Sequence, residues 1–414
     1  MWGIALWKIT ETTRSLPNAG DGVELADAGQ TPEGGVCVVI PAHNEEGEIA
    51  ALVSSLKGQE HPDASFVFAL DRCTDRTRAI AEDAIGGDDR FEIVEINECP
   101  DGWAGKVHAA WTGFSESKTA QSSEFLVFTD ADCRFDPRCL EATLALLDRR
   151  GLDFLSLHSD QSSVTWFERC AQPVACMELL RQYPLSKANR HDENARPFAN
   201  GQFMLFRRSA YDAIGGHSAR PAQLLEDIHF ARHVRRAGFK GGLLASGGML
   251  SCRMYDTWSA FRRGWKRIYT EAANRKSKRL RTAAMRLRLA VGLVPALAIV
   301  GGLSWWPLWN HAETWMQVAS LAVHVIAIGL WATASVAFAR AGRIPISGLM
   351  SWPFGAWLVG GILVEAAADL EAGTPTEWGG RIYDRPDRTD EVNQDGTNQD
   401  EADPKQARPA ETPA

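Results

Sequence analysis

The sequence predicts an α/β domain, with a mostly parallel sheet between helices, followed by C-terminal transmembrane helices. In the first third of the chain, short apolar runs rich in β-branched residues alternate with segments of helical periodicity. Three of these runs end in clusters of polar residues, and the last third contains three long stretches without charge. Alternating strands and helices favour a parallel sheet, in which ligands bind beyond the carboxyl ends of the strands.

The individual elements follow from local patterns. Four apolar runs are expected to form strands, and the fourth leads directly into acids; they are VCVVI (36–40), SFVFAL (65–70), FEIVEI (91–96) and EFLVFTDADC (124–133). Helices are expected where acids or polar turns precede apolar residues at helical spacing, at 44–56, 71–84, 107–114 and 224–239.

Composition narrows the class of protein. The chain has 414 residues and a formal net charge of -8, which argues against a general nucleic-acid partner. None of the eight cysteines forms a CxxC pair. We therefore expect reduced thiols in a cytosolic domain, with no zinc site and no disulfide framework.

Shifts in composition divide the chain into five segments. The first is expected to be a loose leader with a short interfacial helix, and the last a polar, acidic and largely disordered tail. The segments are the leader (1–34), the main domain (35–270), a basic juxtamembrane segment (271–288), two to three transmembrane helices (289–366) and the tail (367–414).

Three uncharged stretches, at 289–309, 315–339 and 344–364, are each long enough to cross a membrane. At ~1.5 Å per helical residue they span a hydrocarbon core of ~30 Å; buried core helices are the alternative. Residues 262–288 hold eleven Lys or Arg and one acid, which marks that side as cytoplasmic. Three full crossings would put the tail outside, so the topology of the third stretch stays open.

Asp130 and Asp132 follow the fourth predicted strand as a DxD pair. Two carboxylates at positions i and i+2 repel each other in a small volume unless a cation lies between them. Their hard oxygen ligands suit Mg²⁺ or Mn²⁺, which also bind phosphates. The alternative is a strand-end turn with two solvated acids.

Two other strand-end features suit a phosphorylated ligand. Asp71 ends the second predicted strand and is a candidate hydrogen-bond acceptor for a base or ribose, whereas Asp75 is assigned to capping the next helix. Lys106 follows two glycines in GWAGK, where its ammonium is able to neutralise phosphate. A solvated lysine is the alternative reading.

Glu226 and Asp227 precede the apolar face of a predicted helix. Acids at a helix start stabilise the helix dipole, but one of them is also a candidate general base for an acceptor hydroxyl. A basic and aromatic stretch beside the first uncharged run is a candidate diphosphate or sugar contact, or else a membrane-interface belt. It comprises Arg253, Tyr255, Trp258, Arg262, Arg263, Trp265 and Lys266.

The order of six motifs resembles family 2 glycosyltransferases. The motifs are PAHNEE (41–46), LDRCTDRT (70–77), GWAGK (102–106), TDADC (129–133), NGQF…RRSAYDAIGGH (200–217) and LLEDI (224–228). The resemblance covers roughly residues 35–270 and continues weakly to WGGRIY (378–383). It implies a GT-A fold that binds a nucleotide sugar, with UDP the expected nucleotide and GDP left open.

The resemblance also implies roles for individual residues. Asp227 is the implied catalytic base of a direct, inverting displacement. Asp130 and Asp132 are implied to hold Mg²⁺ or Mn²⁺. Donor contacts are implied for Pro41, Ala42, Glu45, Asp71, Lys106 and Asp130, and acceptor or diphosphate contacts for Gly201, Gln202, Glu226, Arg253, Tyr255 and Trp265.

Within the family, the motifs look most like bacterial enzymes that glycosylate carotenoid acids and those associated with hopanoids. This likeness implies a membrane lipid acceptor and a multi-pass protein of the inner (plasma) membrane with a cytoplasmic catalytic domain.

Two departures affect these expectations. Leu70 replaces the first of two adjacent acids usual in the family, so nucleoside contact would rest on Asp71 alone. FRRGWKR (261–267) lacks the glutamine of the QxxRW motif of processive synthases. A processive polysaccharide synthase and a non-catalytic membrane scaffold with the same fold remain the competing hypotheses. A dinucleotide oxidoreductase is disfavoured because no GxGxxG follows the first strand.

Overall fold

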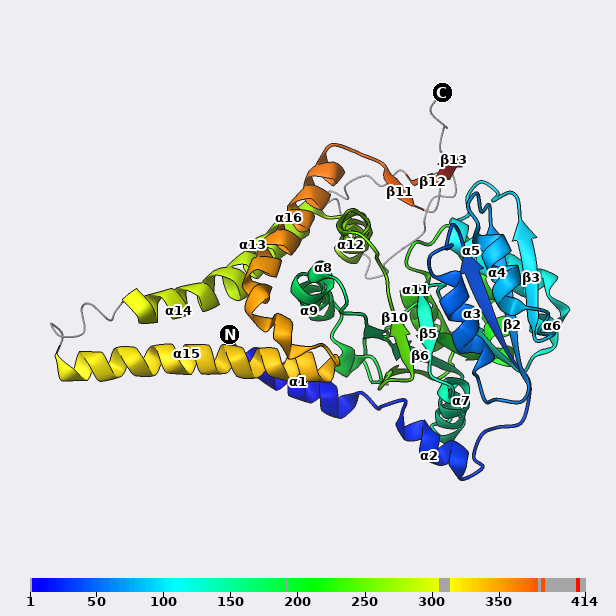
Figure 1. Cartoon of the computed structure of the whole chain (residues 1–414), viewed down its shortest axis with the longest axis horizontal. Helices are drawn as coiled ribbons and strands as arrows, with labels where there is room; N and C mark the ends of the chain where they lie inside the picture. Colours follow the sequence, from blue (N-terminus) through cyan, green and yellow to red (C-terminus); the bar gives the residue numbers. More distant parts are fainter. Residues whose placement is uncertain (1, 191, 305–312, 379–380, 384–406, 410–414) are drawn as a thin grey trace.

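The structure, a computed structural model, shows an α/β body from which two long helices extend. Figure 1 places the sheet at one end of the long axis, whereas helices α14 and α15 point away from the other end. The predicted fold class, a mostly parallel sheet between helices followed by apolar helices, is confirmed. The structure describes residues 2–190, 192–304, 313–378, 381–383 and 407–409.

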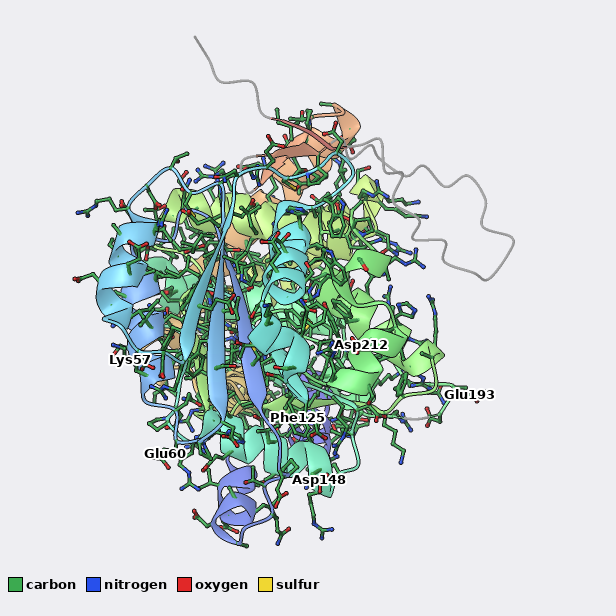
Figure 2. All side chains as sticks on the ribbon, turned by 90° about the vertical axis from the view of Figure 1, so that its right-hand side faces the viewer. Lys57, Glu60, Phe125, Asp148, Glu193 and Asp212 are labelled. Atoms are coloured by element: carbon green, nitrogen blue, oxygen red, sulfur yellow. The ribbon has the colours of Figure 1, made fainter. Side chains whose placement is uncertain are left out.

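The central sheet, as far as the chain is described, has seven strands in the order β3-β2-β1-β4-β8-β6-β9. Strands β3, β2, β1 and β4 are parallel, and β8 inserts antiparallel between β4 and β6. The strands are β1 (Val36–Ala42), β2 (Ala64–Asp71), β3 (Phe91–Ile96), β4 (Phe125–Phe128), β6 (Phe154–His158), β8 (Met204–Arg207) and β9 (Gly241–Ala245). Figure 2 shows the parallel strands from the side of the sheet.

Side chains alternate across β1 because successive residues of a strand point to opposite faces. Val36, Val38 and Ile40 pack with helices α3, α4 and α7 on one face, and Cys37 and Val39 pack with α5 and α11 on the other. The first group of helices comprises α3 (Ile49–Lys57), α4 (Thr77–Ile85) and α7 (Cys139–Arg149), and the second α5 (Gly105–Glu116), α6 (Lys118–Ser122), α10 (Arg208–Ala213) and α11 (Glu226–Arg236).

The parallel register aligns the strand ends that carry the predicted site. Val39 pairs with Phe128 and Ala42 with Leu70, so β1, β2 and β4 end at one edge of the sheet. Helix α5 packs closely behind this edge: a Cβ at Gly113 would lie 2.9 Å from the Ala69 Cβ. The glycine therefore allows the helix that carries Lys106 to approach the sheet.

Helix α3 starts later than predicted, at Ile49 instead of 44, whereas α4 starts at Thr77, after the polar turn that was expected to open it. The polar residues in front of them form two facing turns. The Asn44 side chain accepts a hydrogen bond from the Thr74 amide (2.8 Å), and the Glu45 amide donates to the Thr77 hydroxyl (2.7 Å). These contacts replace the first helical turns that periodicity alone suggests.

The fourth predicted strand is also shorter than expected. β4 ends at Phe128, and the chain turns through Asp130 and Asp132 into β5 (Cys133–Phe135). A second small sheet then has the order β5-β10-β7, with β7 at Asp160–Gln161 and β10 at Leu250–Cys252.

The leader is folded, contrary to the expectation of a loose segment. It forms α1 (Trp2–Ser15) and α2 (Asp21–Asp27), and α1 packs along α15. Ala19 is fully buried, and its amide donates to the Ala245 carbonyl (2.8 Å) at the edge of the central sheet. The predicted leader therefore extends the main domain.

The C-terminal helices build a second core against the α/β body. Trp352 and Ala356 of α16 are buried with Phe261 and Trp265 of α12. A Cβ at Gly355 would lie 2.1 Å from the Cys170 carbonyl oxygen, so α16 touches α8 directly. The helices are α8 (Trp166–Cys170), α9 (Gln172–Gln182), α12 (Trp258–Ala272), α13 (Ser277–Leu287), α14 (Val294–Ser304), α15 (Thr314–Ala341) and α16 (Trp352–Glu371). Short 3-10 turns lie at Leu185–Lys187 (η1), Gly216–Ala219 (η2) and Ile346–Ser351 (η5), and a π turn at Arg288–Leu293 joins α13 to α14.

Two helices are long and apolar enough to cross a membrane by length and composition, Thr314–Ala341 and Ile346–Glu371. The second of the three predicted spans thus falls within α15, and the third coincides with η5 and α16 from Ile346 onward, whereas residues 305–309 of the first lie outside the described residues. Beyond α16, β11 (Thr376–Trp378) and β13 (Ala407–Pro409) both pair with β12 (Arg381–Tyr383). Part of the predicted disordered tail is therefore ordered, while 384–406 and 410–414 are not described.

Candidate active site

The predicted site residues meet at the carboxyl edge of the parallel strands. Lys106, near the start of α5, forms ion pairs with Asp130 after β4 (2.6 Å) and with Glu226 at the start of α11 (2.8 Å). Burial opposes the charge on Lys106, but the two carboxylates outweigh this effect and raise its pKa. Three separate motifs thus converge on one ammonium group.

Asp132 lies in the same region, where its surroundings disfavour the charged form of its carboxyl group. Burial, followed by repulsion from Asp130, raises the pKa of Asp132 to about 7. Burial and then the charges of Asp132 and Asp130 raise the pKa of Glu45 to about 8. Three carboxyl groups that oppose one another's ionisation create a negative potential suited to a divalent cation.

Asp132 and two cysteines form a cluster of possible metal ligands. The Asp132 carboxylate and the sulfurs of Cys133 and Cys252 offer atoms that all lie within 4.8 Å of one another. The cysteines face each other across β5 and β10, and all eight cysteines of the chain are free. Of the predicted metal pair, Asp132 lies with these two thiols, whereas Asp130 points to Lys106.

Asp227 is held by the backbone at the start of α11. One of its oxygens accepts a hydrogen bond from the Gly201 amide (3.0 Å), and the other from the Ile228 amide (2.7 Å). Burial, and then the nearby charge of Glu226, raise the pKa of Asp227 to about 7. A carboxyl group with this pKa is suited to accept a proton at neutral pH.

The NGQF motif supports this carboxylate from beneath. Gly201 fits closely: a Cβ there would lie 3.0 Å from the Lys106 Nζ. Gln202 is only 5 % exposed. Its side-chain Nε2 donates a hydrogen bond to the Cys252 sulfur, and its main-chain carbonyl oxygen accepts one from the Thr129 hydroxyl (2.7 Å). Gly201 therefore contacts the catalytic candidates directly, whereas Gln202 links the strands below them.

The other predicted acceptor residues lie in two places. Arg253 follows β10 and pairs with Glu48 (3.5 Å) and Asp256 (3.1 Å), while its amide donates to the Asp132 carbonyl. Tyr255 packs against α12, where a Cβ at Gly264 would lie 2.1 Å from its oxygen. Trp265 is separate from the site, at 2 % exposure within the second core.

The predicted nucleoside side of the site surrounds the end of β2. Asp71 is 3 % exposed, and both its oxygens bind Arg72 (2.6 and 2.8 Å), which adopts a left-handed backbone conformation. Pro41 and Ala42 end the neighbouring strand, paired in register with the last residues of β2. Asp75 accepts a hydrogen bond from the Thr77 amide (3.0 Å), which agrees with its predicted capping role.

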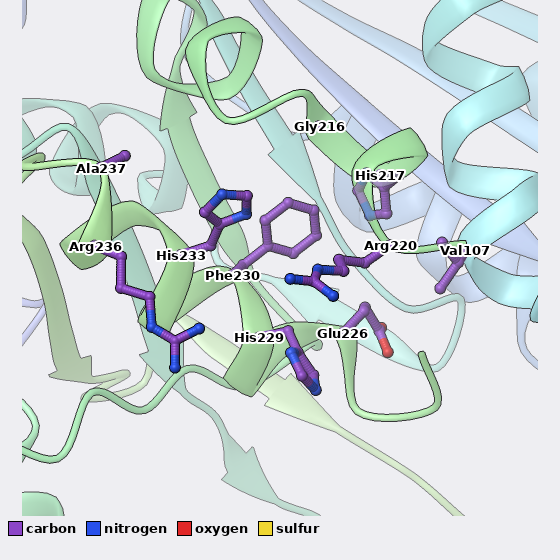
Figure 3. A pocket seen from close by; sticks show the side chains of 10 residues that line it. All are labelled: Val107, Gly216, His217, Arg220, Glu226, His229, Phe230, His233, Arg236 and Ala237. Carbon is purple, nitrogen blue, oxygen red and sulfur yellow. The ribbon is translucent and has the colours of Figure 1, made fainter. Parts of the chain in front are cut away.

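Glu226 also lines a cavity of about 250 Å³ on α11. Figure 3 shows His229, His233 and Arg220 around this cavity, with Phe230 at its wall. Burial, and then the charge of Arg220, lower the pKa of His233, so this ring is neutral near neutral pH. Glu226 thus belongs both to the Lys106 network and to a polar cavity beside it.

Tyr383 is a contact that the sequence did not assign. It is 2 % exposed, its hydroxyl accepts a hydrogen bond from the Gly105 amide (3.3 Å), and it packs with Trp103 and Leu224. The weak WGGRIY signal (378–383) is what pointed to this segment. A residue far along the chain thereby supports the loop that carries Lys106.

Replacing Tyr383 should test whether this contact positions Lys106. In Tyr383→Phe the packing stays and one hydrogen bond is lost, so the donor KM should rise roughly threefold to tenfold with little change in kcat. Tyr383→Ala should raise KM further. Steady-state kinetics on both variants measure this; a Tyr383→Phe variant with normal KM and reduced kcat would contradict a positioning role.

Comparisons with known proteins point to one family. Residues 37–215 match the family model Glycosyl transferase family 2. The 4,4'-diaponeurosporenoate glycosyltransferase of Staphylococcus aureus is 25 % identical over 248 residues, which are 58 % of this chain and 62 % of that protein. The chain therefore matches less than two thirds of the length of these curated relatives.

Solved glycosyltransferase structures also resemble the chain. The mannosyltransferase PcManGT from Pyrobaculum calidifontis, solved with GDP-Man and Mn²⁺, is 16 % identical, with 89 % of this chain and 98 % of that chain covered and a TM-score of 0.44. Glucosyl-3-phosphoglycerate synthase from Mycobacterium tuberculosis, solved with Mn²⁺, UDP and phosphoglyceric acid, is 18 % identical, with 63 % and 86 % covered and a TM-score of 0.39.

The family expected from the six motifs is thus confirmed by the match over residues 37–215. Four of those motifs, those of Lys106, Asp130, Gly201 and Asp227, are adjacent in the structure. Residues 37–215, which are less than half of the chain, match the family 2 glycosyltransferases.

Proposed function

We propose that this chain is a membrane-bound, metal-dependent, inverting glycosyltransferase that moves a sugar from a UDP-sugar onto an apolar lipid. The observation that carries the proposal is the convergence of Lys106, Asp130 and Glu226, with Asp132 and Asp227 beside them, at the carboxyl edge of parallel strands. Nucleotide ligands bind at this edge in open α/β sheets.

The acids fit a divalent cation. Asp132 and Asp130 would hold Mg²⁺ or Mn²⁺, because their carboxylate oxygens are hard ligands, and burial followed by the charge of Asp130 raises the pKa of Asp132. The bound metal would neutralise the diphosphate of the donor. Metal dependence is supported further by the Mn²⁺ in both solved structures cited above.

The remaining residues divide the work of the transfer. Lys106 pairs with the carboxylates of Asp130 and Glu226 and would pair with donor phosphate when the nucleotide sugar binds. Asp227, oriented by two backbone amides, would take the proton of the acceptor hydroxyl. The hydroxyl oxygen then attacks the anomeric carbon as the diphosphate leaves, which inverts the configuration.

The pKa of Asp227 predicts the pH profile. Only the carboxylate form accepts a proton, and the folded chain holds this pKa at about 7. Activity with saturating metal should therefore be low in acid and rise as pH passes through about 7. The pH dependence of kcat/KM measures this; a profile that is already flat from pH 5 upwards would contradict the assignment.

A lipid acceptor is supported by the relatives and by the apolar helices. The curated relatives bear the name of a diaponeurosporenoate glycosyltransferase. In this chain α15 is largely exposed, with Val318, Leu321 and Val325 each more than half accessible. If this exposed apolar helix, which is joined to the catalytic domain, enters a bilayer, the active site would lie beside the membrane.

We propose that the uncharged stretch 289–309, which includes α14, crosses the membrane as a hairpin with α15 and that α16 stays on the catalytic side. The two helices of the hairpin contact each other, and both extend away from the body in Figure 1. Helix α16 is tied to the body by ion pairs of Glu365 with Arg262 (2.7 Å) and Glu371 with Arg281 (2.5 Å). Two crossings bring the chain back to the catalytic side, where the Tyr383 hydroxyl binds the Gly105 amide beside Lys106.

This topology predicts the side on which the tail lies. Green fluorescent protein fused after Ala414 should fluoresce, because it folds on the cytoplasmic side, and alkaline phosphatase at the same position should be inactive. The reverse pair of results would show an odd number of crossings and would overturn the hairpin.

One experiment tests the function as a whole. Membranes that contain the chain are incubated with labelled UDP- and GDP-sugars, and the extracted lipids are identified by mass spectrometry. We expect one labelled glycolipid from a UDP-sugar and none with Asp227→Asn. Label only in a polymer that lengthens with time would support a processive synthase instead.

A further inference from the structure

A large basic groove lies outside the catalytic cluster. It has a volume of about 1020 Å³ and runs between the end of α9, the loop before β8, helix α11 and helix α13. Eight of its sixteen lining residues are Lys or Arg and none is Asp or Glu, although the chain as a whole carries a net charge of -8. This concentration of positive charge therefore needs a specific explanation.

The cations come from separate parts of the chain. Lys278, Arg279 and Arg286 lie on α13, Arg196 comes from the loop before β8, and Arg232 from α11. Positions 278, 279, 282 and 286 fall on one face of α13 because they are three and four residues apart. The fold thus assembles the groove from charges that are up to 105 residues apart in sequence, from Arg181 to Arg286.

Internal carboxylates neutralise only part of this charge. Buried Glu178 pairs with Arg181 and Arg286 (both 2.8 Å) and so fixes one end of the groove. Arg196, Lys278 and Arg279 are exposed. The groove consequently keeps a strong positive potential toward solvent.

The groove adjoins the apolar part of the molecule. Helix α13 continues through the π turn into α14, and along this path Met285, Leu289 and Leu297 are 60 %, 48 % and 57 % exposed. Lys278 and Met285 are seven residues apart, which is ~10 Å along a helix. This is comparable with the depth of a lipid headgroup layer, ~5–8 Å on each side of the hydrocarbon core.

We propose that this groove binds the phosphate-bearing headgroups of anionic phospholipids and so holds the catalytic domain against the membrane surface. The proposal rests on the membrane location proposed above. A row of cations beside exposed apolar residues matches the chemistry of an anionic leaflet, where phosphate lies directly above acyl chains. The cations of the groove are not needed to bind the donor, because the donor phosphates are assigned to Lys106 and the metal.

The full chain, reconstituted in nanodiscs with an equal mixture of phosphatidylcholine and phosphatidylglycerol, provides the test. Native mass spectrometry counts the lipids of each kind that stay bound. We expect a clear preference for phosphatidylglycerol. A variant with Arg196→Gln, Lys278→Gln and Arg279→Gln should lose roughly 10²-fold of this preference, since each basic side chain near an anionic surface contributes roughly a factor of five.

A matched variant controls for net charge. Lys57→Gln, Lys118→Gln and Arg150→Gln remove three exposed cations at the end of α3, the start of α6 and the end of α7, and should keep the preference. Figure 1 shows these three helices on the α/β body, away from α13. Equal thermal unfolding of all three proteins shows that the glutamines have not disturbed the fold.

The outcomes separate the proposal from the function. Equal loss in both variants, or no preference in the wild-type chain retained in nanodiscs, overturns the groove while leaving the glycosyltransferase intact. Displacement of phosphatidylglycerol by inorganic pyrophosphate, with pyrophosphate itself bound, overturns the lipid as occupant. A chain that does not enter nanodiscs refutes the membrane location and the groove together.

Discussion

Asp227→Asn should lower turnover by ~10²–10⁴ while leaving the affinity for donor and metal almost unchanged. The amide keeps the size of the side chain and one oxygen for the Gly201 or Ile228 amide, but it cannot take a proton at neutral pH. The loss should therefore fall on kcat. Steady-state kinetics, together with calorimetric titration of the variant with donor nucleotide and Mn²⁺, separate the two effects.

Asp212→Asn is the matched control. Asp212 is an exposed acid on α10 that pairs with Arg208 (2.7 Å), so its amide variant loses the same charge from the same domain. Its kinetics should equal those of the wild type. If Asp227→Asn weakened donor binding as much as turnover, Asp227 would be a donor ligand and another group would have to act as the base.

Local patterns predict the strands and the order of the motifs well. The run 91–96 matches β3 at both ends, and 36–40 and 65–70 fall inside β1 and β2, because buried parallel strands need apolar, β-branched residues. The family assignment depended on the same short segments. What these segments share is that their structure is decided by residues close in sequence.

The features that were missed depend on distant residues. Nothing near Lys106 indicates that Glu226 is its second partner, and nothing near Gly105 indicates Tyr383. The sequence of residues 44–48 predicts a helix, but in the structure this segment is a turn that is hydrogen-bonded to the Thr74 amide and the Thr77 hydroxyl. Periodicity cannot report such contacts, because the partners are brought together only by the packed fold.

The third apolar stretch shows the same limit. The helix that contains most of it, Ile346–Glu371, is long and apolar enough to cross a membrane. Two acids that follow this stretch, Glu365 and Asp369, pair with Arg262 and Lys266 on α12, which the composition of the stretch does not indicate. Charges spaced one turn apart at the end of an apolar helix are the signal that such a helix packs on a basic partner.

Asp132→Ala should abolish metal-dependent donor binding. The substitution removes a carboxylate whose pKa is raised by burial and by the charge of Asp130, so that Asp130 alone of the pair would remain for the cation. Loss of a metal ligand should cost at least ~10² in metal affinity, since even residues that only orient a ligand are worth 10- to 100-fold. Titration of the purified chain with Mn²⁺ in the presence and absence of UDP measures this loss.

Removing Asp132 should also change its neighbours in a way that a purely structural role would not. Relief of repulsion should lower the pKa of Glu45, since the charge of Asp132 is a main cause, after burial, of its elevation to about 8. Asp136→Ala is the control, because the Asp136 carboxylate accepts a hydrogen bond from the Arg138 amide in front of α7 (3.0 Å) and is not assigned to the metal. Unchanged Mn²⁺ affinity in Asp132→Ala, with the control also unchanged, would move the metal away from this carboxylate and leave the convergence around Lys106 as a site for phosphate alone.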